Sequence, residues 1–168
     1  SSDLEFVMYP FSFAEFIAMQ QEEGLYLSEG KAFQDYLLTG GMPFLSHLPK
    51  EEDAIFQYLR DVYHSVILKD VIGRNAIRDV DLLERIVLYL MANVGHPFSV
   101  NSLTKYFKNE KRNASYETVL NYVKACENAF LLYRVKREDL VGKKSLSVNE
   151  KLYVVDHGIR QAVYGRNQ

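Results

Sequence analysis

The chain has 168 residues, 48% of them apolar and 25% charged, which is the composition of an ordinary soluble globular protein able to bury one hydrophobic core. No apolar run approaches the roughly 18–20 residues that cross a bilayer, and no basic-then-apolar leader opens the chain. We therefore expect a cytoplasmic protein with no membrane partner. Its single cysteine, Cys126, excludes an internal disulfide and is expected to be a small buried apolar side chain.

Charge is divided unevenly along the chain. Residues 1–98 hold 7 Lys and Arg against 15 Asp and Glu, net −8, whereas residues 99–168 hold 13 against 7, net +6. A basic half is typical of a surface that faces nucleic acid, but it also suits attraction to an acidic half or to another domain. Charge alone leaves these readings open.

The first third of the chain predicts two short helices. A strand-like run at residues 4–9 comes first. Ser12 and Glu15 then have the spacing of a capping box, in which each side chain accepts from the other's backbone N–H, and Gly24 ends this helix. The second helix is expected over residues 31–38. Its predicted core side chains are Phe33, Tyr36, Leu37 and Leu38.

A glycine pair followed by proline interrupts the helical pattern at residues 40–44. Gly40 and Gly41 permit positive φ and close backbone approach, and Pro43 suits the first position of a new helix. The segment is either a helix C-cap with a turn or a loop placed against a ligand.

Two longer helices are predicted next. The first covers residues 51–73 and leaves Arg74 as a cation at its end, and the second begins at Asp79 or Asp81 and ends at Gly95. The apolar stripe of the second comprises Leu82, Leu83, Ile86, Val87, Leu90 and Met91.

Residues 97–156 predict two further helices and a hairpin. Ser115 is the expected N-cap of the second of these helices, strands are expected near residues 130–136 and 146–155, and a short helix is expected over 158–164. The predicted inward side chains are Val100, Leu103 and Phe107 in the first helix and Tyr116, Val119, Val123 and Cys126 in the second. We predict a mainly α fold, with a helical lid-like region (1–75) followed by a winged helix-turn-helix with one β-hairpin (76–168).

Motifs for autonomous catalysis are missing from the sequence. Gly142-Lys143 lacks the spacing and the hydroxyl of a P-loop, and there is no G-x-G-x-x-G or G-x-S-x-G. The four histidines are scattered, with no second ligand one helical turn away. We therefore predict no catalytic residue, no metal and no cofactor held by this segment, and no enzyme.

Double-stranded DNA is a candidate partner. The second helix of the 97–156 unit is expected to turn Glu117, Thr118, Asn121, Tyr122, Ala125 and Asn128 outward. Thr118 and Asn121 would suit base edges. That helix carries one cation, Lys124, against two acids, so most phosphate contacts are expected from the preceding loop and from the hairpin. The predicted DNA-binding residues are Lys111, Arg112, Thr118, Asn121, Lys124, Lys136, Arg137, Lys143 and Lys144. A purely structural module that binds protein is the alternative.

Several blocks in the same order resemble one family across nearly the whole chain. The blocks are Tyr9-Pro10-Phe11-Ser12-Phe13-Ala14-Glu15-Phe16, Gly40-Gly41-Met42-Pro43, Tyr58-Leu59-Arg60-Asp61-Val62-Tyr63, Leu68-Lys69-Asp70-Val71 with Arg74, Val119-Leu120-Asn121-Tyr122, Ala129-Phe130-Leu131-Leu132-Tyr133, and Asn149-Glu150-Lys151 with Tyr153-Val154-Val155-Asp156. They look like the bacterial and archaeal AAA-type ATPases that carry a C-terminal domain of unknown function.

The resemblance implies a fragment of a larger ATP-binding protein. In that family a P-loop ATPase domain precedes the first block and a nuclease-like region follows the last, so ATP and Mg²⁺ would be bound by the full-length protein and the P-loop domain would be a partner in cis. Gly41 and Pro43 resemble the Gly-x-Pro lid motif of the related STAND ATPases and become candidate nucleotide-lid residues.

Overall fold

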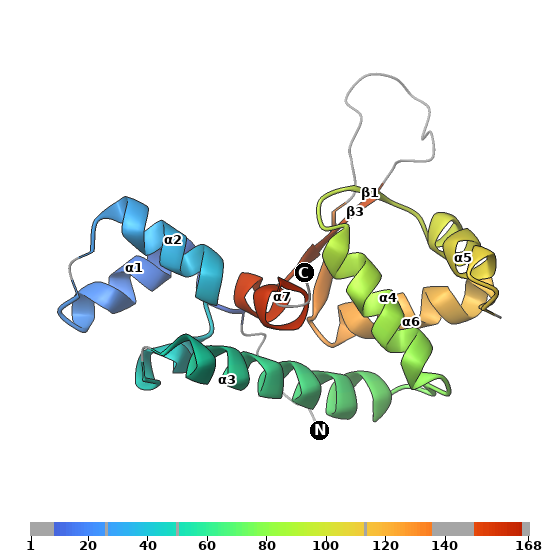
Figure 1. Ribbon diagram of the computed structural model, residues 1–168, viewed down its shortest axis with the longest axis horizontal. Coiled ribbons are helices and arrows are strands. Elements are labelled where there is room, and N and C mark those ends of the chain that lie inside the picture. The colour runs from blue at the N-terminus through green and yellow to red at the C-terminus, as the bar shows by residue number, and fades with distance from the viewer. Residues whose placement is uncertain (1–8, 26, 50, 113, 136–149, 166–168) are drawn as a thin grey trace, which may run out of the picture.

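The computed structural model describes residues 9–165 apart from residues 26, 50, 113 and 136–149. Within these residues the fold is mainly helical with one small antiparallel sheet, as Figure 1 shows. The elements in chain order are α1 (Phe13–Glu22), α2 (Glu29–Thr39), the 3-10 helix η1 (Pro43–His47), α3 (Glu52–Ser65), the π-helix η2 (Val66–Ile72), α4 (Val80–Ala92), β1 (Pro97–Phe98), α5 (Val100–Asn109), α6 (Tyr116–Asn128), β2 (Leu132–Val135), β3 (Glu150–Val154) and α7 (His157–Val163).

The beginnings of the helices follow the predicted caps. At α1 the Ser12 hydroxyl accepts from the N–H of Glu15 at 3.4 Å, and the Glu15 carboxylate accepts from the N–H of Ser12 at 2.8 Å. Ser115 caps α6 in the same way, accepting from the N–H of Thr118 at 3.1 Å. Asp79, not Asp81, caps α4. Local hydrogen bonding therefore determines where these helices start.

The predicted core of α2 is wrong. Phe33, Leu37 and Leu38 are 46%, 41% and 38% exposed, whereas Ala32 is 3% exposed. Helix α2 contacts α1 and α7, and the small Ala32 side chain allows close approach where larger side chains would not fit. Tyr36 is half-buried, and its hydroxyl donates to the carbonyl of Phe11 at 2.8 Å.

The predicted long helix over 51–73 is α3 continued by the π-helical turn η2. Its apolar stripe faces the core through both parts, and α4 contributes its whole predicted stripe. The buried side chains of α3 and η2 are Phe56, Leu59, Tyr63, Ile67 and Val71, and those of α4 are Leu82, Leu83, Ile86, Val87, Leu90 and Met91. The exposed Arg74 pairs with Asp70 at 3.2 Å.

The sheet has three strands in the order β1-β3-β2 and is antiparallel throughout. The predicted hairpin strands are present as β2 and β3, with Tyr133 opposite Tyr153. The third strand, β1, pairs Phe98 with Glu150 and was not predicted, because two residues carry no alternating pattern. The connection between these two strands, residues 136–149, lies outside the described residues.

One hydrophobic cluster joins both halves of the chain. It runs from Phe56 in α3 to Ala162 in α7, so buried side chains are continuous across the expected division at residue 75. In Figure 1, α1 and α2 form one end of the molecule and α4–α6 the other, with α7 between them and α3 running beneath. Helix α7 packs on both α2 and α3. The division into regions 1–75 and 76–168 stays a prediction.

Cys126 is completely buried in this cluster, as predicted. Burial raises the pKa of its thiol to about 12. Since only the thiolate is nucleophilic, we expect alkylation by iodoacetamide at about pH 8 to be at least roughly 100-fold slower in the folded protein than in urea. Mass spectrometry of the modified fraction over time measures this, and equal rates with and without urea would contradict it.

Candidate functional site on helix α6

Helix α6 has one face in the core and one face in solvent. Val119, Val123 and Cys126 are fully buried, and the helix contacts α4, α5, η2 and β2. Its outer face belongs to the region in which the sequence predicts DNA-binding residues.

The predicted division of α6 into two faces is wrong at three positions. Tyr116, expected inside, is 48% exposed, while Tyr122 and Ala125, expected outside, are 5% and 2% exposed. At Tyr122 the difference follows from a tertiary hydrogen bond. The Tyr122 hydroxyl oxygen accepts from the backbone N–H groups of Arg78 at 3.1 Å and Asp79 at 3.0 Å, which brings this side of α6 against the start of α4.

We expect Tyr122→Phe to lower the free energy of unfolding by about 1–2 kcal/mol, because it leaves two backbone N–H groups without their acceptor. Urea titration followed by circular dichroism measures the change. Tyr116→Phe is the matched control on the same helix and is expected to change stability by less than about 0.5 kcal/mol. Equal effects of the two substitutions would show that the Tyr122 hydroxyl contributes nothing.

A groove of about 800 Å³ lies between the outer face of α6 and the turn before α4. Its walls carry both signs of charge together with several amides. The lining residues are Asn75, Ala76, Ile77, Arg78, Asp79, Leu82, Glu117, Thr118, Asn121, Tyr122, Lys124, Ala125 and Asn128.

The groove brings together three of the predicted DNA-binding residues. Thr118, Asn121 and Lys124 all line it, although the Thr118 hydroxyl also lies 2.9 Å from the Ser115 hydroxyl at the N-cap. Sequence reasoning missed Arg78, because nothing in the local pattern shows that the turn before α4 lies beside α6.

Of the two predicted DNA-binding cations in the α5–α6 turn, one is exposed and the other already has a partner. Lys111 is exposed and has a left-handed backbone, with φ 58°. Arg112 is half-buried and forms an ion pair with Asp81, which also pairs with Arg85 at 3.3 Å. Hydrogen bonds from these arginines, Arg112 first, lower the pKa of the Asp81 carboxyl. The other four predicted cations, Lys136, Arg137, Lys143 and Lys144, lie outside the described residues.

Charge on the α6 groove is balanced. Arg78 and Lys124 stand against Asp79 and Glu117. Beyond the groove, Arg134 of β2 is held by Glu127 at 2.8 Å and by Glu150 at 2.6 Å, so that cation is already neutralised. A protein surface with matching charges fits this groove better than a row of phosphates does.

The predicted lid residues lie at a different place, on the junction between α2 and α7. Gly40 caps α2 with φ 79°, as the first of the two alternatives expects, and the N–H of the buried Gly41 donates to the Asp156 carboxylate at 2.8 Å. Pro43 is exposed and starts η1. The roles of Gly41 and Pro43 toward nucleotide stay predictions.

Asp156 is the residue of this junction that sequence reasoning missed. It is 3% exposed, and its second oxygen accepts from the N–H of Ile159 at 2.9 Å as the N-cap of α7. Burial raises the pKa of the Asp156 carboxyl, although the N–H groups of Gly41 and Ile159 oppose the shift. An aspartate three residues before an apolar helical position is a cap signal, but it came directly after a strand pattern.

The fold and this surface define a mainly helical protein with a small antiparallel sheet and a polar groove on one helix. The part of the chain that the structure describes holds no group of three or more His, Cys, Asp or Glu side chains placed to bind a metal ion. None of the described helices is both long enough and apolar enough to span a membrane.

The chain belongs to the family described as "Domain of unknown function (DUF8612)", whose model matches residues 30–168. It is also similar to an uncharacterized protein of Haemophilus influenzae, with 29% identity over 163 residues. The alignment covers 97% of this chain but 40% of that relative, so the chain spans about two fifths of the relative's length. No solved structure matches the chain. Neither description names an ATPase.

Proposed function

We propose that this chain is a non-catalytic winged-helix module of a larger protein and that the outer face of α6 docks on another protein domain. The element order α4-β1-α5-α6-β2-β3 and the strand order β1-β3-β2 support this, because both are expected of a winged helix-turn-helix. In such a fold α6 would be the second, partner-facing helix. The single observation that carries the proposal is the groove on α6 with two cations and two acids.

The larger protein in this proposal is an AAA-type ATPase related to the STAND class, located in the cytoplasm. The ordered sequence blocks support it, and the length of the Haemophilus relative provides sequence for further domains. A P-loop domain in cis would bind ATP and Mg²⁺, and the residues 41–43 would lie at its lid.

Hydrogen exchange tests the docking proposal. We would compare the whole Haemophilus influenzae relative with its isolated region equivalent to this chain. Amides matching residues 75–79 and 116–128 are expected to exchange at least tenfold more slowly in the whole protein, because docking would keep these amides from opening to water. Equal exchange of these amides in the two proteins would overturn the proposal.

DNA is the second candidate, favoured by the exposed Lys111 and Lys124 and by the net charge of +6 over residues 99–168. Fluorescence anisotropy with a labelled duplex at low and moderate salt distinguishes the two functions. If α6 docks on protein, we expect the chain to bind the duplex only weakly. The double variant Lys111→Glu with Lys124→Glu should then change the affinity for DNA by less than about twofold. A steep salt dependence that this double variant reduces would establish the DNA function instead.

A further inference from the structure

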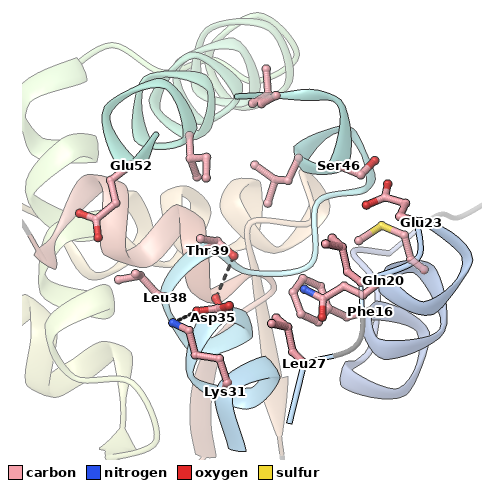
Figure 2. A pocket seen from close by; sticks show the side chains of 15 residues that line it. Phe16, Gln20, Glu23, Leu27, Lys31, Asp35, Leu38, Thr39, Ser46 and Glu52 are labelled. Atoms are coloured by element: carbon pink, nitrogen blue, oxygen red, sulfur yellow. Dashed lines mark hydrogen bonds and ion pairs between the residues drawn. The ribbon is translucent and has the colours of Figure 1, made fainter. Parts of the chain in front are cut away.

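A second cavity lies at the opposite end of the molecule from the α6 groove. It has a volume of about 360 Å³ and is bounded by α1, α2, η1 and the start of α3. Figure 2 shows its lining side chains, among them Phe16 and Gln20 from α1 and Leu38 and Thr39 from α2. It is separate from the surface used in the proposed function.

The walls of this cavity are mainly apolar. Leu27 and Leu38 are 43% and 38% exposed, and both line this hollow, which is partly open to solvent. The other apolar lining residues are Phe16, Met19, Leu25, Leu45, Leu48 and Ile55. A flexible methionine among leucines suits a site that accepts apolar side chains of a partner.

The rim of the cavity is acidic. Four charged residues line it, namely Glu23, Lys31, Asp35 and Glu52. Lys31, the cation among these four described residues, is already paired, because its ammonium group lies 2.7 Å from the Asp35 carboxylate. Glu23 and Glu52 are exposed and stand at opposite sides of the cavity in Figure 2. An occupant therefore meets an apolar centre with a negative charge on either side.

We propose that this cavity binds a basic amphipathic α-helix of a partner protein. The apolar face of that helix would enter between α1, α2 and α3, and its Lys or Arg side chains would pair with Glu23 and Glu52. The described walls are helices and turns and present no strand edge, so an extended segment would leave its backbone groups unpaired, whereas a helix satisfies its own. The acidic rim also disfavours nucleic acid and anionic lipid.

The probe for this site is a labelled leucine–lysine amphipathic helix of about 18 residues, or about five turns. We expect it to bind the 168-residue protein, and we expect the same helix with glutamate at every lysine position to bind at least tenfold more weakly. Glu23→Lys with Glu52→Lys should weaken binding of the lysine probe at least tenfold. Asp61→Lys with Glu84→Lys changes the net charge equally at exposed positions of α3 and α4 outside both the cavity and the α6 groove, and should leave affinity within about twofold.

Nuclear magnetic resonance locates the site on the unmutated protein. Backbone amide shifts on adding the lysine probe are expected to concentrate in residues 16–27, 38–48 and 52–55. Shifts centred on α6 or spread over all acidic helices would overturn the proposal, as would equal affinity of the two probes or equal loss in the two double variants.

Discussion

Gly158→Ala is expected to lower the free energy of unfolding by about 2–3 kcal/mol, although alanine is normally the better helix residue. Gly158 is the second residue of α7, and a Cβ there would collide with the backbone carbonyl oxygen of Thr39. Since that neighbour is backbone rather than the end of a flexible side chain, α2 and α7 would have to separate. Urea denaturation followed by circular dichroism measures the loss.

Gly30→Ala is the matched control for that substitution. Gly30 is also the second residue of its helix, α2, and nothing lies within 4 Å of a Cβ built on it. Alanine there should stabilise the protein by about 0.5–1 kcal/mol through its higher helix propensity. If both variants changed stability in the same direction by the same amount, close packing of α7 on residue 39 would not matter for folding.

Asp156→Ala is expected to cost about 3 kcal/mol. Loss of the N-cap of α7 destabilises the protein by about 1 kcal/mol. The N–H of Gly41 is then buried without an acceptor, which costs a further amount of about 1–3 kcal/mol. Asp79→Ala, which removes the cap of the more exposed helix start at α4, should cost only about 1 kcal/mol. Equal losses would show that the bond to Gly41 is energetically neutral.

Asp156 also predicts a pH dependence. Burial raises its folded-state pKa above the ordinary value of about 3.9, so the folded protein holds this proton more tightly than the unfolded chain does. The resulting stability is fully present below the unfolded pKa and is lost as pH rises through the folded pKa. Relative to Asp156→Asn, the unsubstituted protein should therefore become less stable between about pH 3 and its folded pKa. Unfolding titrations of both proteins across that window would refute this if their difference stayed constant or changed in the opposite sense.

Features of the fold that depend on local sequence could be predicted. The capping box at Ser12 and Glu15, the cap at Ser115 and the complete stripe of α4 rest on hydrogen bonds and periodicity within one or two helical turns. Periodicity shows that a helix has an apolar side, but it does not show which residues of that side another helix covers. Phe33, Leu37 and Leu38 were therefore assigned to the core although α2 buries the smaller Ala32.

The candidate site was predictable only where it depends on local sequence. Thr118, Asn121 and Lys124 follow from the exposed face of a single helix. Arg78 and the inward turn of Tyr122 depend on a contact between residues 44 positions apart, which no local pattern contains. The junction of Gly41 with Asp156 spans 115 positions and was missed altogether.

That last separation determines the order in which the molecule can be completed on the ribosome. The α1–α2 pair emerges before α7, because the carboxylate and the helix that hold residues 39–41 are synthesised 115 residues later. At translation rates of about 5–20 residues per second, the interval is roughly 6–23 s. During that time the nascent α1–α2 hairpin exposes the apolar surface that α7 later covers, so this segment stays open to chaperones and to aggregation until α7 has been synthesised.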